Sequence, residues 1–249
     1  MENIIKIFKS IDELSHFFAL KLIARIRETP AGHFFSLVLS GGSTPRKVFE
    51  YLALNFRDHI AWQKILVFWG DERCVVPESD ESNYKMAKES LLDQIPIPAD
   101  NIFRIKGETD PHFESDRYAE VVRQHVPSYH NIPQFDFMLL GLGDDGHTAS
   151  IFPANIHLFS NDKLYVVSEN PFTKQKRISV TGKIINQAKT VVFLVTGESK
   201  AEIIYSVIEK KAGWDKLPAS LVRPENGELL WLLDKEAALR LNITRDTSH

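Results

Sequence analysis

The sequence predicts an α/β fold in which helices cover both faces of a doubly wound, mostly parallel sheet. Short apolar runs rich in Val, Ile, Leu and Phe alternate with amphipathic stretches of helical period, which is the pattern of such a sheet. A chain of 249 residues, 43% of them hydrophobic, is long enough to bury a sizeable core. Because no repeat, low-complexity tract or long linker divides it, we expect a single domain over residues 1–249.

The predicted strands are the apolar runs, and the predicted helices fall between them. The strands are residues 4–8, 34–39, 64–69, 135–140, 163–168, 191–196 and 228–233. Ser10 and Glu13 form a capping-box start for the first helix, and residues 80–83 open another. The helices expected from their apolar periodicity are residues 12–28, 84–95, 112–126 and 199–211.

Charge and cysteine content narrow the class of protein. A formal net charge of -3 and a pI near 6.3 give no general attraction to nucleic acid or anionic lipid, so any anion site must be local. The single cysteine, Cys74, excludes an intrachain disulfide. The opening segment lacks the features of a signal peptide, and no apolar run approaches the roughly 20 residues that span a bilayer. We therefore expect a soluble, cytoplasmic protein.

Ligands of open α/β sheets bind beyond the carboxyl ends of the strands, so the residues after each apolar run are the informative ones. After residues 34–39, Gly41 and Gly42 let the backbone approach a ligand, and Ser43 or Thr44 can cap the following helix. A well-capped helix start explains the Ser-Thr-Pro run alone. The two preceding glycines favour a phosphate cradle instead.

Three further strand ends supply charged groups. After residues 64–69, one of the two acids Asp71 and Glu72 can orient or activate a reacting group, and Arg73 can clamp an anion, although a surface ion pair explains this segment about as well. Arg177 lies beside a short strand that precedes a helix capped by Thr181, and Lys200 lies at a strand-to-helix turn. Together with the glycine loop, these cations predict a site for a phosphorylated small molecule. Cys74 is expected to be a small buried residue.

The segment GLGDDGHTAS contains Gly141, Gly143 and Gly146 at the G-x-G-x-x-G spacing of dinucleotide-binding loops. Two aspartates in this turn would repel a pyrophosphate, and Pro153 leaves little helix to supply a dipole. Glu169 nevertheless lies about where a ribose-binding acid is expected. A dinucleotide site therefore stays open as the weaker interpretation.

The stronger interpretation of this segment centres on His147. A histidine with Asp144 and Asp145 close in sequence, following a glycine-rich turn at a strand end, is suited to general-base catalysis. These three side chains could also hold a metal ion. No second His or Cys cluster has ligand spacing, so we expect no metal site.

Several segments in order resemble the 6-phosphogluconolactonase family, which is related to the glucosamine-6-phosphate isomerase/deaminase fold. They are LSGGSTPRKVFEYLA, FWGDERCVVPESDESNY, LLGLGDDGHTASIFP, RISVT, TGESKAEII and LPASLV. The resemblance implies a Rossmann-like sheet and hydrolysis of 6-phospho-D-glucono-1,5-lactone to 6-phospho-D-gluconate, in the oxidative pentose phosphate pathway, without an obligatory cofactor.

The resemblance also implies roles for individual residues. His147 would activate water, and Asp71 stands where the deaminases carry their catalytic acid. The phosphate would be bound by the substrate-binding set Gly41, Gly42, Ser43, Thr44, Arg73, Arg177 and Lys200. The approach to Arg177, NPFTKQKRIS, departs from the family pattern because it lacks the proline-and-histidine-rich run often found there.

Three alternatives to the lactonase remain. Glucosamine-6-phosphate deaminase activity is the nearest, although deaminases usually carry a tyrosine where Arg73 stands. A noncatalytic sugar-phosphate-binding module would keep the glycine loop and Lys200 without needing His147, and a nicotinamide-dependent dehydrogenase is the third. The expected partner is a small-molecule substrate, with no nucleic acid and no membrane, and the sequence leaves the oligomeric state open.

Overall fold

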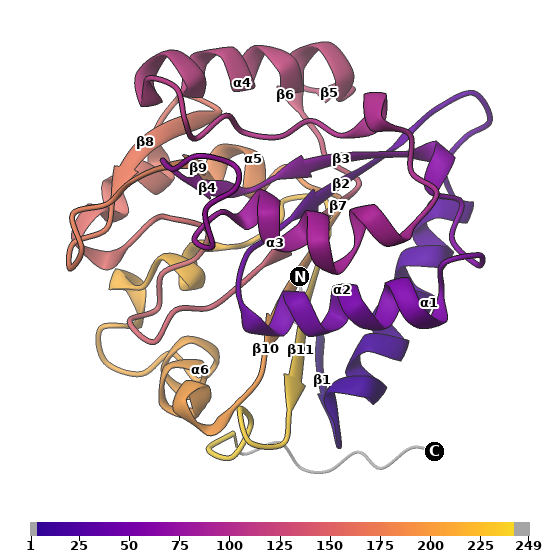
Figure 1. The fold of residues 1–249 in the computed structure, drawn as a ribbon. Helices are drawn as coiled ribbons and strands as arrows, with labels where there is room; N and C mark the ends of the chain where they lie inside the picture. The colour runs from indigo at the N-terminus through magenta and orange to yellow at the C-terminus, as the bar shows by residue number, and fades with distance from the viewer. Residues whose placement is uncertain (1–3, 242–249) are drawn as a thin grey trace.

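The computed structural model describes residues 4–241, which are built around one six-stranded sheet (Figure 1). The strand order is β1-β11-β10-β7-β2-β3, and every pairing in this sheet is parallel. The strands are β1 (Ile4–Phe8), β2 (Phe35–Leu39), β3 (Ile65–Trp69), β7 (Phe137–Leu140), β10 (Thr190–Val195) and β11 (Glu228–Asp234). The predicted α/β class, the mostly parallel sheet and six of the seven expected strands are therefore confirmed.

The seventh expected strand lies outside this sheet. β8 (Tyr165–Glu169) pairs antiparallel with β9 (Lys176–Val180), and β9 pairs antiparallel with β4 (Asp71–Arg73). β8 and β9 are joined by a tight turn in which the Asn170 N–H donates to the Gln175 carbonyl at 2.9 Å. A parallel pair needs a crossover of about a dozen residues, so a connection this short gives a hairpin. A two-stranded ribbon of β5 (Ser128–Tyr129) and β6 (Ile132–Pro133) completes the strands.

The helices lie on both sides of the large sheet. Figure 1 shows α1 (Ile11–Arg27), α2 (Ser43–Asn55) and α3 (Asn83–Ser90) to one side, and α6 (Ala201–Ile208) to the other. α4 (Pro111–His125) packs on the small sheet, and α5 (Gly182–Ile185) is a single turn. The predicted helices over 84–95 and 199–211 are shorter than expected because α3 is followed, and α6 preceded, by 3-10 turns, Leu92–Gln94 and Glu198–Lys200.

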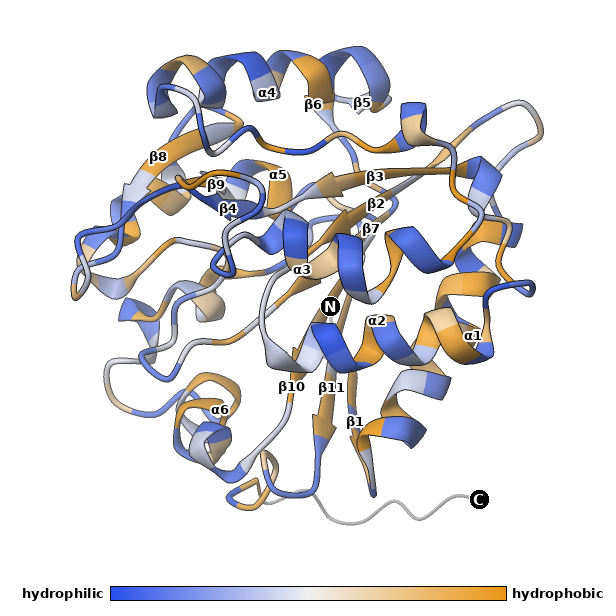
Figure 2. Ribbon diagram, in the orientation of Figure 1, coloured by the Kyte–Doolittle hydropathy of each residue, from blue (hydrophilic) through white to orange (hydrophobic). Residues whose placement is uncertain are grey.

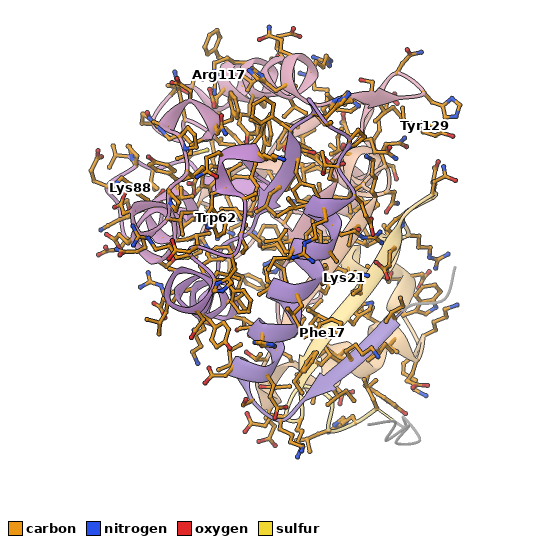
Figure 3. The ribbon with its side chains drawn as sticks, turned by 90° about the vertical axis from the view of Figure 1, so that its right-hand side faces the viewer. Phe17, Lys21, Trp62, Lys88, Arg117 and Tyr129 are labelled. Atoms are coloured by element: carbon orange, nitrogen blue, oxygen red, sulfur yellow. The ribbon has the colours of Figure 1, made fainter. Side chains whose placement is uncertain are left out.

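Side-chain capping follows the sequence at the first helix but not at α5. The Glu13 N–H donates to Ser10 Oγ at 3.2 Å, as predicted, while the Glu13 carboxylate accepts from the Lys9 N–H at 2.9 Å. Thr181 is the N-cap residue of α5, as predicted, but its side chain makes no capping hydrogen bond because the hydroxyl donates to the Lys163 carbonyl at 2.8 Å. Figure 3 shows α1 lying beside β1 and β11, where Lys21 pairs with Glu228 at 2.7 Å.

The strands of the large sheet form the apolar centre of the molecule. All five residues of β2 and of β3 are buried, and Figure 2 shows the strands as continuous hydrophobic segments, whereas the helices alternate between hydrophobic and hydrophilic residues. Because β2, β7 and β10 are neighbours, the loops that follow them meet at one edge of the sheet. Over residues 4–241, no helix has the length and apolar character needed to cross a membrane.

Candidate active site

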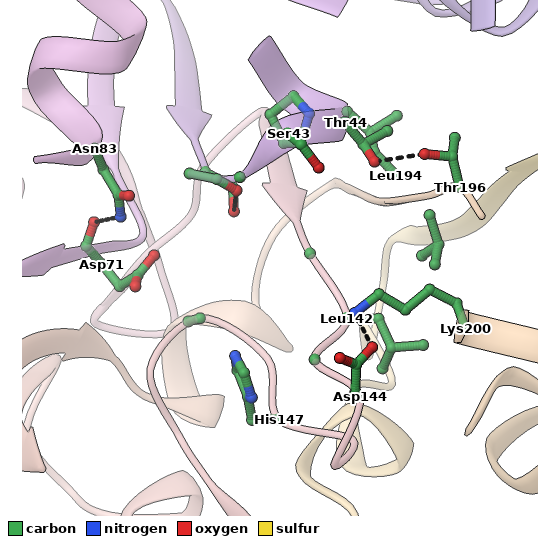
Figure 4. Close-up of a pocket in the computed structure, with 18 of the residues that line it drawn as sticks. Ser43, Thr44, Asp71, Asn83, Leu142, Asp144, His147, Leu194, Thr196 and Lys200 are labelled. Carbon is green, nitrogen blue, oxygen red and sulfur yellow. Dashed lines mark hydrogen bonds and ion pairs between the residues drawn. The ribbon is translucent and has the colours of Figure 1, made fainter. Parts of the chain in front are cut away.

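A pocket of about 260 Å³ opens at the carboxyl ends of the central strands (Figure 4). All the predicted site residues line it, although they come from five separate segments of the sequence. They are Gly41, Gly42, Ser43, Thr44, Asp71, Arg73, His147, Arg177 and Lys200. The large sheet contributes the glycine loop, the His147 loop and Lys200, and the small sheet contributes Asp71 and the two arginines.

The start of α2 differs from the prediction in a way that favours an anion. Gly42 is the capping residue, with φ of 115°, so neither Ser43 nor Thr44 caps the helix. Thr44 Oγ1 instead lies 2.7 Å from Thr196 Oγ1, which ties α2 to the end of β10 (Figure 4). Within the described chain no side chain caps α2, and its first turn contains no acidic residue. The first backbone N–H groups therefore face the pocket without an internal acceptor.

Gly41 is needed for a close approach between two segments. A Cβ atom at this position would lie 1.9 Å from Asn83 Oδ1. Asn83 lines the pocket and donates from Nδ2 to the Asp71 carbonyl at 2.9 Å (Figure 4). The sequence analysis missed Asn83, since its role depends on a contact with the glycine loop that no local pattern encodes.

Glu72 fixes the backbone between β4 and α3. Its carboxylate is buried and accepts hydrogen bonds from the Asn83 and Tyr84 N–H groups at 2.7 and 2.8 Å, from the Arg73 N–H at 2.8 Å and from Ser82 Oγ at 3.0 Å. Burial raises the pKa of Glu72, although these hydrogen bonds oppose the shift. Glu72 does not line the pocket, so its role is to hold Asp71 and Arg73 in place.

Cys74 follows this segment and is half-buried rather than fully buried as expected. Burial, together with the charge of Glu72, raises the pKa of its thiol to about 11. The thiol therefore stays protonated near neutral pH and is a poor nucleophile.

The two arginines lie opposite each other in the small sheet. Arg73 on β4 is the antiparallel partner of Arg177 on β9, and like charges in directly opposite positions repel. Arg73 donates to the Glu81 carbonyl, and Arg177 to Ser150 Oγ at 3.4 Å. The Nε atom of each is buried and has no hydrogen-bond partner among residues 4–241. Burial lowers the pKa of Arg177; Asp71 opposes this shift and Arg73 adds to it. A bound anion would relieve this repulsion.

Asp71 lies beside this pair and is 5% exposed. Its Oδ2 accepts a hydrogen bond from Ser150 Oγ at 2.6 Å, so Ser150 stands between Asp71 and Arg177. Ser150 follows His147 closely in sequence and is fully buried. This residue was also missed, because its partner is distant in the sequence.

His147 is oriented by Asp145. Its Nδ1 lies 2.6 Å from Asp145 Oδ1, and its backbone N–H donates to the same oxygen at 3.1 Å. Burial alone would raise the pKa of Asp145, but the hydrogen bond and charge of His147 outweigh it and lower that pKa. An ionised carboxylate only accepts hydrogen bonds, so Nδ1 carries the proton and Nε2 is left as the acceptor in the neutral ring.

Gly143 and Phe152 restrict the ring of His147 on two sides. A Cβ atom on Gly143 would lie 2.0 Å from His147 Nδ1, and the ring of Phe152 packs at 4.5 Å between centroids. The Arg177 guanidinium lies 5.6 Å from the same Phe152 ring. Phe152 thus links the His147 loop with the arginine pair.

The two aspartates that precede the histidine have separate partners. Asp145 holds His147, whereas Asp144 pairs with Lys200 at 2.6 Å (Figure 4). In the part of the chain that the structure describes, no three His, Cys, Asp or Glu side chains converge in the manner of metal ligands.

The geometry argues against a dinucleotide loop. The segment after Gly146 runs into a 3-10 helix, Pro153–Ser160, so no α-helix begins where a pyrophosphate would bind. Glu169, the expected ribose-binding acid, is exposed and does not line the pocket. The glycines instead shape the loop that carries His147. Gly143 makes room for the imidazole ring, and Gly146 adopts a positive φ of 82° within the turn.

Comparison with known proteins agrees with this geometry. Residues 9–231 match the family model described as glucosamine-6-phosphate isomerases/6-phosphogluconolactonase. The chain is 43% identical over 210 residues to the 6-phosphogluconolactonase of Haemophilus influenzae, covering 84% of this chain and 88% of the relative. The solved structure of 6-phosphogluconolactonase from Trypanosoma brucei is 29% identical with a TM-score of 0.86, covering 96% of this chain and 99% of that one.

A monomeric glucosamine-6-phosphate deaminase has the same fold, with a TM-score of 0.79 at 22% identity, covering 95% of this chain and 99% of that one. The family model spans most of the sequence and includes every residue that lines the pocket. The chain belongs to the glucosamine-6-phosphate isomerase/6-phosphogluconolactonase family.

Proposed function

We propose that this chain is an enzyme that hydrolyses 6-phospho-D-glucono-1,5-lactone to 6-phospho-D-gluconate in the oxidative pentose phosphate pathway. The observation that carries the proposal is the position of His147, whose Nδ1 lies 2.6 Å from Asp145 Oδ1. The same pocket contains the start of α2 and the two arginines whose Nε atoms have no hydrogen-bond partner among residues 4–241. The similarity to named 6-phosphogluconolactonases supports the same reaction.

The hydrolysis needs a base that later returns its proton. Nε2 of His147 takes a proton from water as the water oxygen attacks the lactone carbonyl. The carbonyl oxygen becomes an oxyanion, which backbone amides or a nearby cation stabilise. The carbon–oxygen bond of the ring then breaks, and the imidazolium gives its proton to the departing ring oxygen. Asp145 stabilises the imidazolium between these two steps.

The phosphate group positions the lactone for this attack. We assign it to the backbone N–H groups at the start of α2, around Gly41–Thr44, with Lys200 and the arginine pair as its cationic partners. Holding the carbonyl in place removes part of the entropic cost of the reaction, which can contribute several kcal/mol. Asp71 is the second catalytic candidate, since its carboxylate lies in the same pocket.

The same proposal includes three broader expectations from the sequence. The substrate is a small phosphorylated sugar lactone rather than a nucleic acid, because the net charge is -3. Residues 1–249 act as a single catalytic domain. A cytoplasmic location is consistent with the single cysteine.

Hydrolysis of freshly generated lactone tests the proposal, with a control lacking enzyme because this lactone also opens spontaneously. We expect the wild-type protein to accelerate the reaction and folded His147→Gln to lose roughly 10²–10⁴-fold of that acceleration. Near-normal turnover by the variant would remove His147 from the mechanism. If the wild-type protein gives no acceleration, release of ammonia from glucosamine 6-phosphate tests the deaminase alternative.

A further inference from the structure

The ion pair between Asp144 and Lys200 spans two neighbouring strand ends. Asp144 lies in the loop after β7, and Lys200 ends the 3-10 turn after β10. Asp144 Oδ1 and Lys200 Nζ are 2.6 Å apart, and both residues line the pocket (Figure 4). The cation assigned to the substrate phosphate is therefore already paired with a carboxylate inside the site.

The two partners differ in exposure. The Asp144 side chain is 74% exposed, whereas that of Lys200 is 21% exposed. The carboxylate can therefore turn into water while the ammonium stays at the pocket. Ion pairs with an exposed partner contribute little to stability, so opening this one costs little.

Asp144 and a bound phosphate would compete for the same ammonium group. Both are anions, and a phosphate monoester carries about -1.5 to -2 charges at neutral pH. The neighbouring Asp145 cannot take this role because it is engaged with His147. Among residues 4–241, Lys200 is the only recorded side-chain partner of Asp144, so no other contact explains the position of its carboxylate.

We propose that Asp144 is a built-in competitor for Lys200 that lowers the affinity of the pocket for phosphorylated ligands. The inference rests on the proposed function, which assigns Lys200 to the phosphate. Its consequence extends to the product, which keeps the phosphate and gains one negative charge when hydrolysis converts the uncharged lactone group into a carboxylate. Asp144 therefore favours product release.

A purely structural role for the pair predicts the opposite effect. If Asp144 only held Lys200 in place, its removal would misplace the ammonium group and weaken phosphate binding. Competition predicts that removal strengthens binding. The sign of the change in affinity thus separates the two roles.

Calorimetric titration with inorganic phosphate and with 6-phosphogluconate tests the proposal on the full chain. We expect Asp144→Asn to lower the dissociation constant of both ligands by at least about twofold, as expected for an exposed ion pair. Glu198→Gln is the matched control. It removes one negative charge from the exposed surface of the turn that ends at Lys200, and Glu198 does not line the pocket. Affinities that stay within twofold or weaken in Asp144→Asn, an equal gain in the control, or no binding of either ligand would overturn the proposal.

The same substitution in a Lys200→Met background shows whether the effect passes through Lys200. Competition predicts a clearly smaller gain in that background, and an equal gain would reduce Asp144 to a general charge effect and overturn the proposal. Titration requires no turnover, so the result is independent of the lactonase assay. Tighter phosphate binding by Asp144→Asn together with an inactive wild-type protein would reject the proposed reaction and keep the competition for Lys200.

Discussion

The pocket is built by two regions of different architecture. The six-stranded parallel sheet supplies loops at its carboxyl edge: the glycine loop before α2, the His147 loop and the turn with Lys200. The three-stranded antiparallel sheet supplies side chains from the strands themselves, with Arg73 and Arg177 in register. The two regions meet at Phe152, which contacts the His147 ring and lies under the Arg177 guanidinium.

The two regions place side chains that are suited to different functions. The parallel sheet places a histidine whose tautomer is set by a neighbouring carboxylate, as a proton-transfer step requires. The small sheet places two cations directly opposite each other, each with a buried Nε atom that has no hydrogen-bond partner among residues 4–241, as binding of an anion requires. We therefore expect damage to the His147 loop to reduce turnover and damage to the arginine pair to reduce affinity.

The largest effect is expected at Asp145. In Asp145→Asn the new amide donates to Nδ1, which moves the ring proton to Nε2 and blocks its role as base. We expect kcat to fall by roughly 10²–10⁴-fold with little change in phosphate affinity. Steady-state kinetics and phosphate titration of the folded variant check this. A kcat within threefold of wild type would contradict the role of Asp145 in setting the tautomer of His147.

A smaller effect is expected at the arginine pair. Arg73→Met should weaken binding of inorganic phosphate by about tenfold, the size of one charge-assisted contact. Because the substitution also removes a like-charge repulsion, the free energy of unfolding without phosphate should stay constant or rise, by about 0.2–1 kcal/mol. Urea unfolding with and without phosphate measures both quantities. A loss of stability together with unchanged phosphate affinity would show that Arg73 is structural.

The smallest effect is the pH dependence of stability that arises from Asp145. The pKa of this carboxyl is lowered in the folded protein, so its contribution is present above the unfolded value of about 3.9 and is lost as pH falls through the folded value. The difference in unfolding free energy between wild type and Asp145→Asn should therefore shrink below about pH 4. Urea unfolding from pH 7 to pH 3 measures it, and a difference that grows on acidification would contradict the assigned hydrogen bond between Asp145 and His147.

The sequence predicted the large sheet and the grouping of the site residues because both follow from position along the chain. Buried parallel strands are continuous apolar runs, and the residues after them must lie at one edge. Gly41 and His147 could be placed at this edge by this rule alone, and both line the pocket.

The features that the sequence did not predict depend on contacts that local patterns do not encode. The small sheet was missed because β4 is only three residues long and pairs with a strand a hundred residues away. Ser150 and Asn83 were missed for a similar reason, since each acts through a hydrogen bond to Asp71 from another segment. The cap of α2 was assigned to Ser43 or Thr44, one or two residues late, because Gly42, which has no side chain, is the capping residue.

The most direct test of the account is a comparison of kcat and KM for His147→Gln and Arg73→Met with 6-phosphogluconolactone as substrate. The account predicts that His147→Gln lowers kcat by roughly 10²–10⁴-fold at nearly unchanged KM. It predicts that Arg73→Met raises KM with a much smaller change in kcat. The reverse pattern, or equal losses of kcat in both variants, would contradict the separation of proton transfer at His147 from anion binding at the arginine pair.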